Sequence, residues 1–536
     1  MRKSERKWPV SNRVIYFFMG LLAVFMHFYK LDCVPYGLHI DEAGMAYDAF
    51  CLANYSVDRY LNHLPVYLTN FGGGQSALYG YLTAGLIKLT GMLNPWIIRL
   101  PGALIGMLGY FSGIGIVRKC LGEKWGLLTS FFMAIFPYFI MQSRFGLDCN
   151  LLLGISIFGV WMLLRAEEKK KTCYFILAGI VWGICYYTYA LGYIGSTLFL
   201  GSLLVYWLYH KKITWKQAFC FGIPILLMVW PLGLMLIINS LGMEKVVIGP
   251  FTIPRLPDYR GGELTLDDVW GRFRTVWKSI LTRDNLSYNA LDHFYTMYVI
   301  SIPFAVIGAI KMIVDMIKDI IRHHYSAWHP FVLWFCSWLL VGSITGGTGP
   351  NINRLNGMFF ALLFCVLYGM RCTLEAFRNW LYNDVIKKGR IKKALLSIKY
   401  LDKKIQGIVL LAYFFCFFFF AGYYFIRYPQ DIYPQTLFAD TCEDIIEFIE
   451  REREETTAVY MDASHIYYLL SIKADPYEVN LTETRPETYG KYNFYLPDEI
   501  DENAVYIVRE TNTEYCDRLQ EMSFDVYHSG MYNCYY

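Results

Sequence analysis

Long apolar stretches recur along the chain and limit the folds that it can adopt. A membrane-spanning helix needs about 20 mostly apolar residues, and eleven stretches approach that length: 14–29, 97–117, 125–142, 147–164, 174–190, 193–209, 217–239, 295–314, 330–346, 355–370 and 406–426. Charged residues make up only 18% of the sequence, whereas soluble domains carry about a quarter. The sequence therefore predicts an α-helical polytopic membrane protein.

Basic residues between these stretches predict the orientation of the chain in the cell membrane. The first thirteen residues include five Lys and Arg, so the positive-inside rule places the N-terminus in the cytoplasm. A twelfth apolar stretch, 75–91, is short and contains Lys88. If it crossed the membrane, the later basic connections would face outward. We therefore expect 75–91 to lie at the interface, with loops 30–96 and 240–294 on the outer side.

The composition changes sharply after residue 426. Residues 427–536 contain 8 Lys and Arg against 23 Asp and Glu, whereas the preceding part carries a net charge of +19. Helical patterns alternate there with β-branched and aromatic runs, as in small α/β domains. We expect a transmembrane domain over 1–426 and a soluble extracytoplasmic α/β domain over 427–536. Its cysteines, Cys442, Cys516 and Cys534, allow at most one internal disulfide.

Two adjacent carboxylates, Asp41 and Glu42, follow the first apolar stretch. Charges this close to a membrane are costly to desolvate unless they are paired, bound to a ligand or used in chemistry. They could be the N-cap and the first turn of a helix that continues through 43–53. The helical and catalytic interpretations are compatible, because a helix N-terminus can present a carboxylate to a cavity.

Two further polar elements stand at the predicted outer ends of apolar stretches. Arg144 and Asp148 are spaced i, i+4 and could simply pair with each other. Arg354 follows the Gly-rich turn 346–350. Its planar guanidinium suits a phosphate group, although it could equally reach toward lipid head groups.

The order of these elements resembles the GT-C fold membrane glycosyltransferases that use polyprenyl-phosphate sugars. The similar groups are the protein O-mannosyltransferases and the aminoarabinose (lipid A) transferases. The resemblance covers about residues 14–370 and rests on Asp41-Glu42-Ala43, Tyr47, the glycines 72–74, the stretch 75–91, Arg99-Leu100-Pro101, Arg144, Asp148 and Arg354. One departure is that the families have a Lys or His with prolines where this chain has Gly74-Gln75.

The resemblance implies that the protein moves a sugar from a polyprenyl-phosphate donor to an extracytoplasmic lipid, cell-wall polymer or protein, with inversion at the anomeric carbon. It implies Asp41 as the general base, with Glu42 as a catalytic residue that positions the acceptor or holds Asp41 in place. The substrate-binding residues that it implies are Arg144, Asp148, Arg354 and Tyr47. Gln75, which stands where the families differ, is expected to take over a polar contact with the substrate. No cofactor is certain, and we predict no metal ligands because this site has no Asp-x-Asp pair.

A polytopic lipid or polysaccharide transporter, or a polymerase without this donor chemistry, would show the same hydropathy. Transporters usually place charges near the bilayer midplane and contain inverted repeats, whereas the candidate charges here gather at one membrane face. The basic residues are dispersed over many connections, which argues against nucleic-acid binding. The sequence leaves the sugar, the acceptor and the oligomeric state open.

Overall fold

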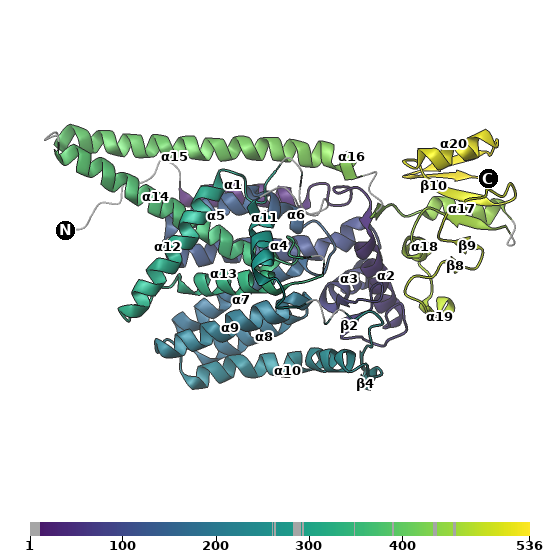
Figure 1. Cartoon of the computed structure of the whole chain (residues 1–536), viewed down its shortest axis with the longest axis horizontal. Coiled ribbons are helices and arrows are strands. Elements are labelled where there is room, and N and C mark those ends of the chain that lie inside the picture. Colours follow the sequence, from purple (N-terminus) through teal and green to yellow (C-terminus); the bar gives the residue numbers. More distant parts are fainter. Residues whose placement is uncertain are drawn as a thin grey trace.

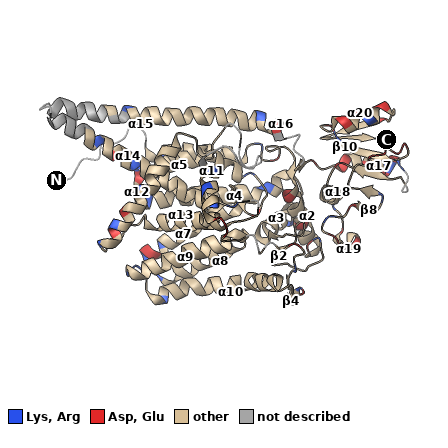
Figure 2. Cartoon of the chain, viewed as in Figure 1, with Lys and Arg blue, Asp and Glu red and all other residues tan. Residues whose placement is uncertain are grey.

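A computed structural model describes residues 11–259, 261, 264–281, 291, 294–347, 349–387, 391–432, 437–453 and 457–536. Long helices form a bundle, and a smaller unit that contains a β-sheet lies at one end of it, beside α2 and α3 (Figure 1). Lys, Arg, Asp and Glu gather at the opposite tips of several helices and in the smaller unit (Figure 2). The middle of the bundle carries few charged residues.

Each predicted apolar stretch corresponds to a helix or a pair of helices. These helices are α1 (Asn12–Phe28), α4 (Pro95–Leu121), α5 (Glu123–Ile135), α6 (Pro137–Gln142), α7 (Asn150–Lys169), α8 (Thr172–Tyr186), α9 (Ala190–Tyr209), α10 (Trp215–Ser240), α12 (Ser301–Ile321), α13 (His329–Ile344), α14 (Phe359–Lys387) and α15 (Ile391–Gly422). Among the described residues, six helices are long and apolar enough to cross a membrane. The polytopic membrane architecture is confirmed, whereas the number of eleven spans stays a prediction.

The third predicted stretch, 125–142, is broken into two helices. Helix α5 ends at Ile135, Phe136 is extended, and α6 begins at Pro137. Proline lacks an N–H group and disfavours helical geometry in the residue before it. Although α4 and α10 continue through prolines, Phe136 takes the extended geometry and the helix is interrupted there. The prediction of a single stretch is corrected here.

The first external loop folds into helices α2 (Ile40–Tyr55) and α3 (Ala77–Thr90), with a short antiparallel pair, β2 (Tyr67–Leu68) and β3 (Gln75–Ser76), between them. Helix α3 packs along α2. Its 14 residues span about 21 Å, which is less than the hydrocarbon layer of about 30 Å. Its length therefore fits the interfacial position that we predict for 75–91.

The second external loop contains β4 (Val246–Ile248), β5 (Phe251–Ile253) and α11 (Val269–Leu281). Strands β4 and β5 form a hairpin that lies at the end of α10 (Figure 1). The backbone of this hairpin also reaches the first external loop, because Val66 N–H donates to the carbonyl of Thr252 at 3.0 Å.

The C-terminal part holds a mixed six-stranded sheet in the order β11-β12-β10-β7-β9-β8. Its strands are β7 (Val459–Met461), β8 (Thr488–Tyr489), β9 (Tyr492–Asn493), β10 (Val505–Arg509), β11 (Val526–Ser529) and β12 (Tyr532–Tyr535). Its helices are α17 (Glu443–Glu452), α18 (His465–Ser471), α19 (Pro476–Val479) and α20 (Thr513–Glu521). The three cysteines of this part are buried and unbonded to each other.

The C-terminal part is attached to the first external loop close to Asp41. Strand β6 (Phe438–Ala439) pairs antiparallel with β1 (Leu38–His39). The Tyr467 hydroxyl donates to the carbonyl of Leu38 at 2.9 Å, and helix α18 packs on α2. Polar and backbone contacts therefore join two segments that are about 400 residues apart in sequence.

Candidate active site

Helix α2 begins with a capping box centred on His39. The Nδ1 atom of His39 accepts the N–H of Asp41 at 3.2 Å, and the Glu42 carboxylate accepts the N–H of His39 at 3.3 Å. This reciprocal arrangement satisfies two N–H groups that the helix leaves unbonded. The expected helix is present, but its N-cap is His39 instead of Asp41.

Glu42 is completely buried and forms a two-pronged ion pair with Arg99. The distances from Nε and Nη2 of Arg99 to the two carboxylate oxygens are 2.8 and 3.0 Å, and neither side chain is exposed. Glu42 also accepts the N–H of Gly146 at 2.8 Å. Arg99 in turn donates to the carbonyls of Leu31 and Pro35. Glu42 thus fixes the first turn of α2, next to Asp41, and the catalytic role that the resemblance implies for it stays a prediction.

Asp41 differs from its neighbour because 42% of its side chain is exposed. Its Oδ1 atom accepts a hydrogen bond from Asn70 Nδ2 at 2.9 Å. Its Oδ2 atom lies 3.7 Å from Nδ1 of His39, which already accepts the Asp41 N–H. One carboxylate oxygen is therefore anchored, and the other is directed toward solvent-accessible space.

Asp148 lies in the connection before α7 and is buried against the start of α3. Its carboxylate accepts the N–H groups of Ser76 and Cys149 at 2.9 and 2.7 Å. Burial raises the pKa of Asp148 to about 7, with a smaller contribution in the same direction from the charge of Asp41 and an opposing one from the two N–H bonds. Asp41 and Asp148 thus lie within electrostatic reach of each other, on the α2 and α3 sides of one site.

Gln75 and Arg354 border the same region. Gln75 immediately precedes Ser76, is 5% exposed, and within the described chain its Oε1 has no hydrogen-bond partner. Arg354 is 8% exposed and donates through Nη1 to the carbonyl of Gly346 at 2.6 Å. Burial raises the pKa of Tyr189, and the charges of Asp148 and Arg354 act on the same hydroxyl in opposite directions. Tyr189 therefore lies within electrostatic reach of both charged groups.

Arg144 has a different role from the one that the sequence suggested. It is fully buried and donates to five main-chain carbonyls at the end of α1 and just beyond it, those of Met26, His27, Tyr29, Lys30 and Val34, at 2.8–3.1 Å. A guanidinium at a helix C-terminus satisfies carbonyls that the helix leaves unbonded. Arg144 does not form an ion pair with Asp148, and it does not face open space. Its expected contact with phosphate is therefore corrected to a structural contact with main-chain carbonyls.

Tyr47 also lies away from the open side of the site. Its ring is fully buried in the cluster shared by α2 and the C-terminal part. Its hydroxyl donates to the carbonyl of Ala474 at 3.2 Å. The expectation of substrate binding is corrected here, because Tyr47 fastens the C-terminal part to α2.

An apolar cavity of about 280 Å³ adjoins the start of α3. Leu78 and Tyr81 of α3 line it, and they follow directly after Ser76, which holds Asp148. The remaining wall comes from the two residues before β2, the end of α8, α10 and the β4–β5 hairpin. These residues are Pro65, Val66, Tyr187, Trp230, Pro231, Ile248, Phe251 and Ile253. The cavity thus offers an apolar surface beside a cluster of charged groups.

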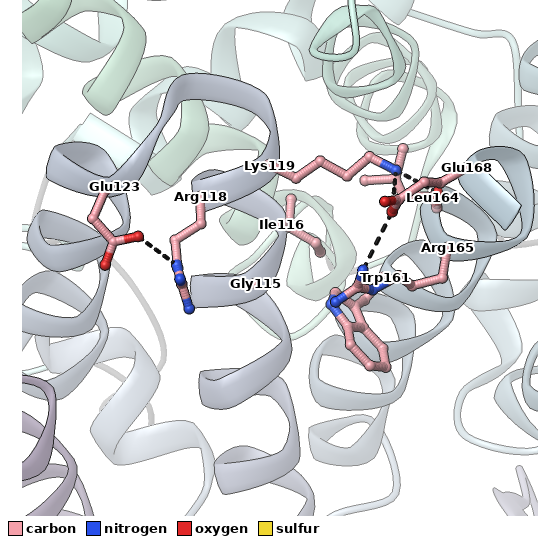
Figure 3. Close-up of a pocket in the computed structure, with 9 residues that line it drawn as sticks. All are labelled: Gly115, Ile116, Arg118, Lys119, Glu123, Trp161, Leu164, Arg165 and Glu168. Carbon is pink, nitrogen blue, oxygen red and sulfur yellow. Dashed lines mark hydrogen bonds and ion pairs between the residues drawn. The ribbon is translucent and has the colours of Figure 1, made fainter. Parts of the chain in front are cut away.

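A second cavity, of about 370 Å³, lies at the far end of α4 (Figure 3). Its basic side chains are already paired, with Arg118 2.8 Å from Glu123 and Lys119 3.2 Å from Glu168. Arg118 follows Arg99 by nineteen residues of the same helix, which corresponds to about 28 Å. This cavity is therefore separate from the site around Asp41.

Sequence reasoning missed the arginines and the asparagine that organise the carboxylates. Arg99 stands within an apolar segment, where a charge normally has a specific partner, and that signal could have linked it to Glu42. Arg59 and Asn70 lie in an irregular loop with no distinctive spacing. Among the described residues, no three His, Cys, Asp or Glu side chains are grouped to hold a metal ion.

Comparisons with known proteins support the fold. Residues 75–234 match the family described as dolichyl-phosphate-mannose-protein mannosyltransferase. The structure is similar to ArnT from Cupriavidus metallidurans bound to undecaprenyl phosphate, with a TM-score of 0.54, 13% identity, and coverage of 98% of this chain and 97% of that one. This chain has the GT-C fold. The match and the fold support a membrane glycosyltransferase that uses a polyprenyl-phosphate-linked sugar, as the sequence predicts.

Two further solved structures resemble the chain at low identity. The apo state of the same ArnT has a TM-score of 0.50 at 13% identity and covers 98% of this chain and 97% of its own. The second is the archaeal oligosaccharyltransferase AglB from Archaeoglobus fulgidus, in complex with an inhibitory peptide and a dolichol-phosphate. Its TM-score is 0.48 at 12% identity, and the match covers 91% of this chain and 61% of AglB. No curated protein sequence matches this chain.

We predict that Arg99→Met strongly destabilises the fold, because it leaves Glu42 charged and unpaired in a fully buried position. The free energy of unfolding should fall by about 3–5 kcal/mol, measured by denaturant titration in detergent. The matched control is Arg118→Met, which removes an arginine from an exposed ion pair and should cost about 1 kcal/mol or less. Equal losses in the two variants would contradict the assignment.

Proposed function

We propose that this protein transfers a sugar from a polyprenyl-phosphate donor to an extracytoplasmic acceptor hydroxyl or amine, with Asp41 as the general base. The observation that carries the proposal is the contrast among the three acids of α2. Glu42 is paired with Arg99 and Asp48 with Arg59, both deeply buried. Asp41 alone is partly exposed, and within the described chain it contacts no arginine side chain.

The pairing pattern matters because the carboxylates of Glu42 and Asp48 are buried and occupied by arginine side chains. Neither carboxylate is open to an incoming acceptor. Asp41 is held by a neutral amide and has an oxygen directed outward, which are the properties of an available base.

The proposed reaction is a direct displacement. The acceptor heteroatom attacks the anomeric carbon, the bond between that carbon and the phosphate oxygen breaks, and the proton of the acceptor passes to Asp41. Polyprenyl phosphate leaves with the electron pair. Since Arg144 is committed to main-chain carbonyls, the expected neutralisation of phosphate charge falls to Arg354, with Gln75 and Tyr189 as neighbouring polar groups.

The apolar cavity beside α3 supports a lipid-linked donor. It is large enough for a few isoprene units, and Leu78, which lines it, lies two residues after Ser76, which binds Asp148. In the proposed arrangement the isoprenoid chain occupies this cavity and the phosphate lies toward Arg354. The identity of the sugar and of the acceptor is left to experiment.

The decisive test is release of polyprenyl phosphate by the purified protein in lipid nanodiscs, supplied with a panel of polyprenyl-phosphate sugars. We expect Asp41→Asn to lower turnover by at least about a hundredfold, as loss of a general base typically does. Asp32→Asn, an exposed carboxylate of the same loop, is the matched control and should retain activity. No release by the wild-type protein from any donor would refute the proposed function.

The raised pKa of Asp148 predicts a pH dependence of donor binding. Below about pH 7 the carboxyl is protonated and can donate a hydrogen bond to the phosphodiester, whereas above it the carboxylate repels that anion. The KM for the donor should therefore rise as the pH passes upward through about 7. In Asp148→Asn, which stays neutral, the rise should disappear. A rise that persists in this variant would assign the ionisation to another group.

A second prediction concerns the apolar cavity. Replacing Trp230 and Phe251 with alanine should raise the KM for a long-chain donor at least several-fold while changing kcat little, because these side chains contact only the lipid chain. Phe219→Ala, on the same helix as Trp230 but outside the cavity, is the control. A short-chain donor should lose less affinity than the long one, and equal losses would contradict the assigned role.

A further inference from the structure

The orientation of Asp41 depends on a residue that sequence reasoning did not select. Asn70 lies in the loop between β2 and β3 and is 7% exposed. Its Nδ2 donates to Oδ1 of Asp41 at 2.9 Å. Within the described chain its own Oδ1 has no hydrogen-bond partner, although it is buried. A buried amide oxygen needs a nearby donor or positive charge.

Arg59 supplies that positive charge. Its guanidinium is 1% exposed, and its Nη1 has no hydrogen-bond partner among the described residues. Oδ1 of Asn70 and Nη1 of Arg59 both lie over Gly44 of α2. A Cβ atom added to Gly44 would stand 2.6 Å from the first and 3.3 Å from the second. The absence of a side chain at Gly44 therefore allows Arg59 and Asn70 to meet on the helix surface.

Arg59 also determines which way the Asn70 amide points. If the amide were rotated by half a turn, its NH₂ group would face the N–H groups of the guanidinium, and two sets of donors would oppose each other. With the oxygen toward Arg59, the NH₂ group faces Asp41. The charge on Arg59 thus selects a donor, and not an acceptor, for the carboxylate of Asp41.

Arg59 is itself held rigidly by Asp48. Its Nε and Nη2 atoms lie 2.9 and 2.7 Å from the two carboxylate oxygens, and its main-chain N–H donates to the same carboxylate at 3.1 Å. Asp41, Gly44 and Asp48 are spaced i, i+3 and i+7, so they share one face of α2. The chain of contacts from Asp48 through Arg59 and Asn70 returns to the same helix at Asp41.

We propose that Asn70 is a positioning residue for Asp41, and that Arg59 fixes the direction of the Asn70 amide. The proposal rests on the proposed function, in which Asp41 is the base. The interposed amide anchors one oxygen of Asp41 and leaves the other directed toward the acceptor. It also separates Asp41 from the cation, so that the carboxylate is oriented by Arg59 without being neutralised by it.

Other titratable groups face Asp41 and must be considered in any pH experiment. His39 lies before it on the N-cap of α2, Glu42 follows it, and Asp148 approaches from the connection before α7. From the C-terminal part, Tyr467 is within electrostatic reach. Cys149, beside Asp148, is also within electrostatic reach of Asp41. A substitution at position 70 leaves the identity of all these groups unchanged.

The test is Asn70→Asp, which keeps the shape of the side chain but places a carboxylate where the NH₂ donor stood. Asp41 should then ionise at higher pH by about one unit or more, because a like charge replaces a hydrogen-bond donor. Carbodiimide labelling of Asp41, quantified by mass spectrometry across a pH series, measures that midpoint directly, since only the protonated carboxyl reacts. The acid limb of the kcat profile should move in the same direction, with kcat near neutral pH at least tenfold lower.

Asn62→Ala is the matched control. Asn62 is another buried asparagine of the same loop, but it bonds Asp58, so its loss should leave the Asp41 midpoint unchanged. Arg59→Lys, which keeps the charge beside Asp48 but loses the planar donor group, should lower kcat more than it changes the KM of either substrate. This variant serves as the second readout if Asn70→Asp does not fold.

Unchanged labelling and kcat in folded Asn70→Asp, or a midpoint shift of the same size in Asn62→Ala, would overturn the proposal. A wild-type protein that transfers no sugar would refute the proposed function instead. Labelling would still decide the link between Asn70 and Asp41 in that case, because it requires no turnover.

Discussion

The buried ion pair between Glu42 and Arg99 is the contact on which the arrangement of the outer face depends. It joins the first turn of α2 to the first turn of α4, and it also reaches the main chain at Gly146 and in the segment before β1. Both charges are removed from water, so each would be strongly unfavourable without the other. The pair therefore holds three separate segments in one geometry, and Asp41 occupies the position next to it.

The three acids of α2 show how one short helix can carry different chemistry at neighbouring positions. Glu42 and Asp48 are buried and meet arginines, whereas Asp41 is partly exposed and meets an amide. Arginine side chains thus occupy two of the three carboxylates, and Asp41 remains open for the role of base that we propose. Asn70, which bonds Asp41, lies 29 residues away in sequence. The different surroundings of the three acids are therefore a property of the folded loop.

The C-terminal part contributes to the same construction. Strand β6 pairs with β1 directly before the capping box of α2, and Tyr47 and Tyr467 connect the two parts through main-chain carbonyls. The acidic C-terminal part thus packs on α2 through α18, and its Tyr467 lies within electrostatic reach of Asp41. Its position beside the first external loop makes it a natural neighbour of an incoming acceptor, a role that stays a prediction.

The sequence by itself determined the helical membrane architecture, because runs of apolar residues are legible without knowledge of their neighbours. It also singled out Asp41, which the resemblance to GT-C glycosyltransferases implies as the general base, and that role stays a proposal. It could not determine the partners of Glu42, Arg144 or Tyr47, and the roles of Arg144 and Tyr47 were reassigned. Their partners are main-chain carbonyls or side chains 57 to 427 residues away, and no local pattern encodes such contacts. Only the tertiary structure, by burying some charges against others and leaving Asp41 open, decided which acid is available for catalysis.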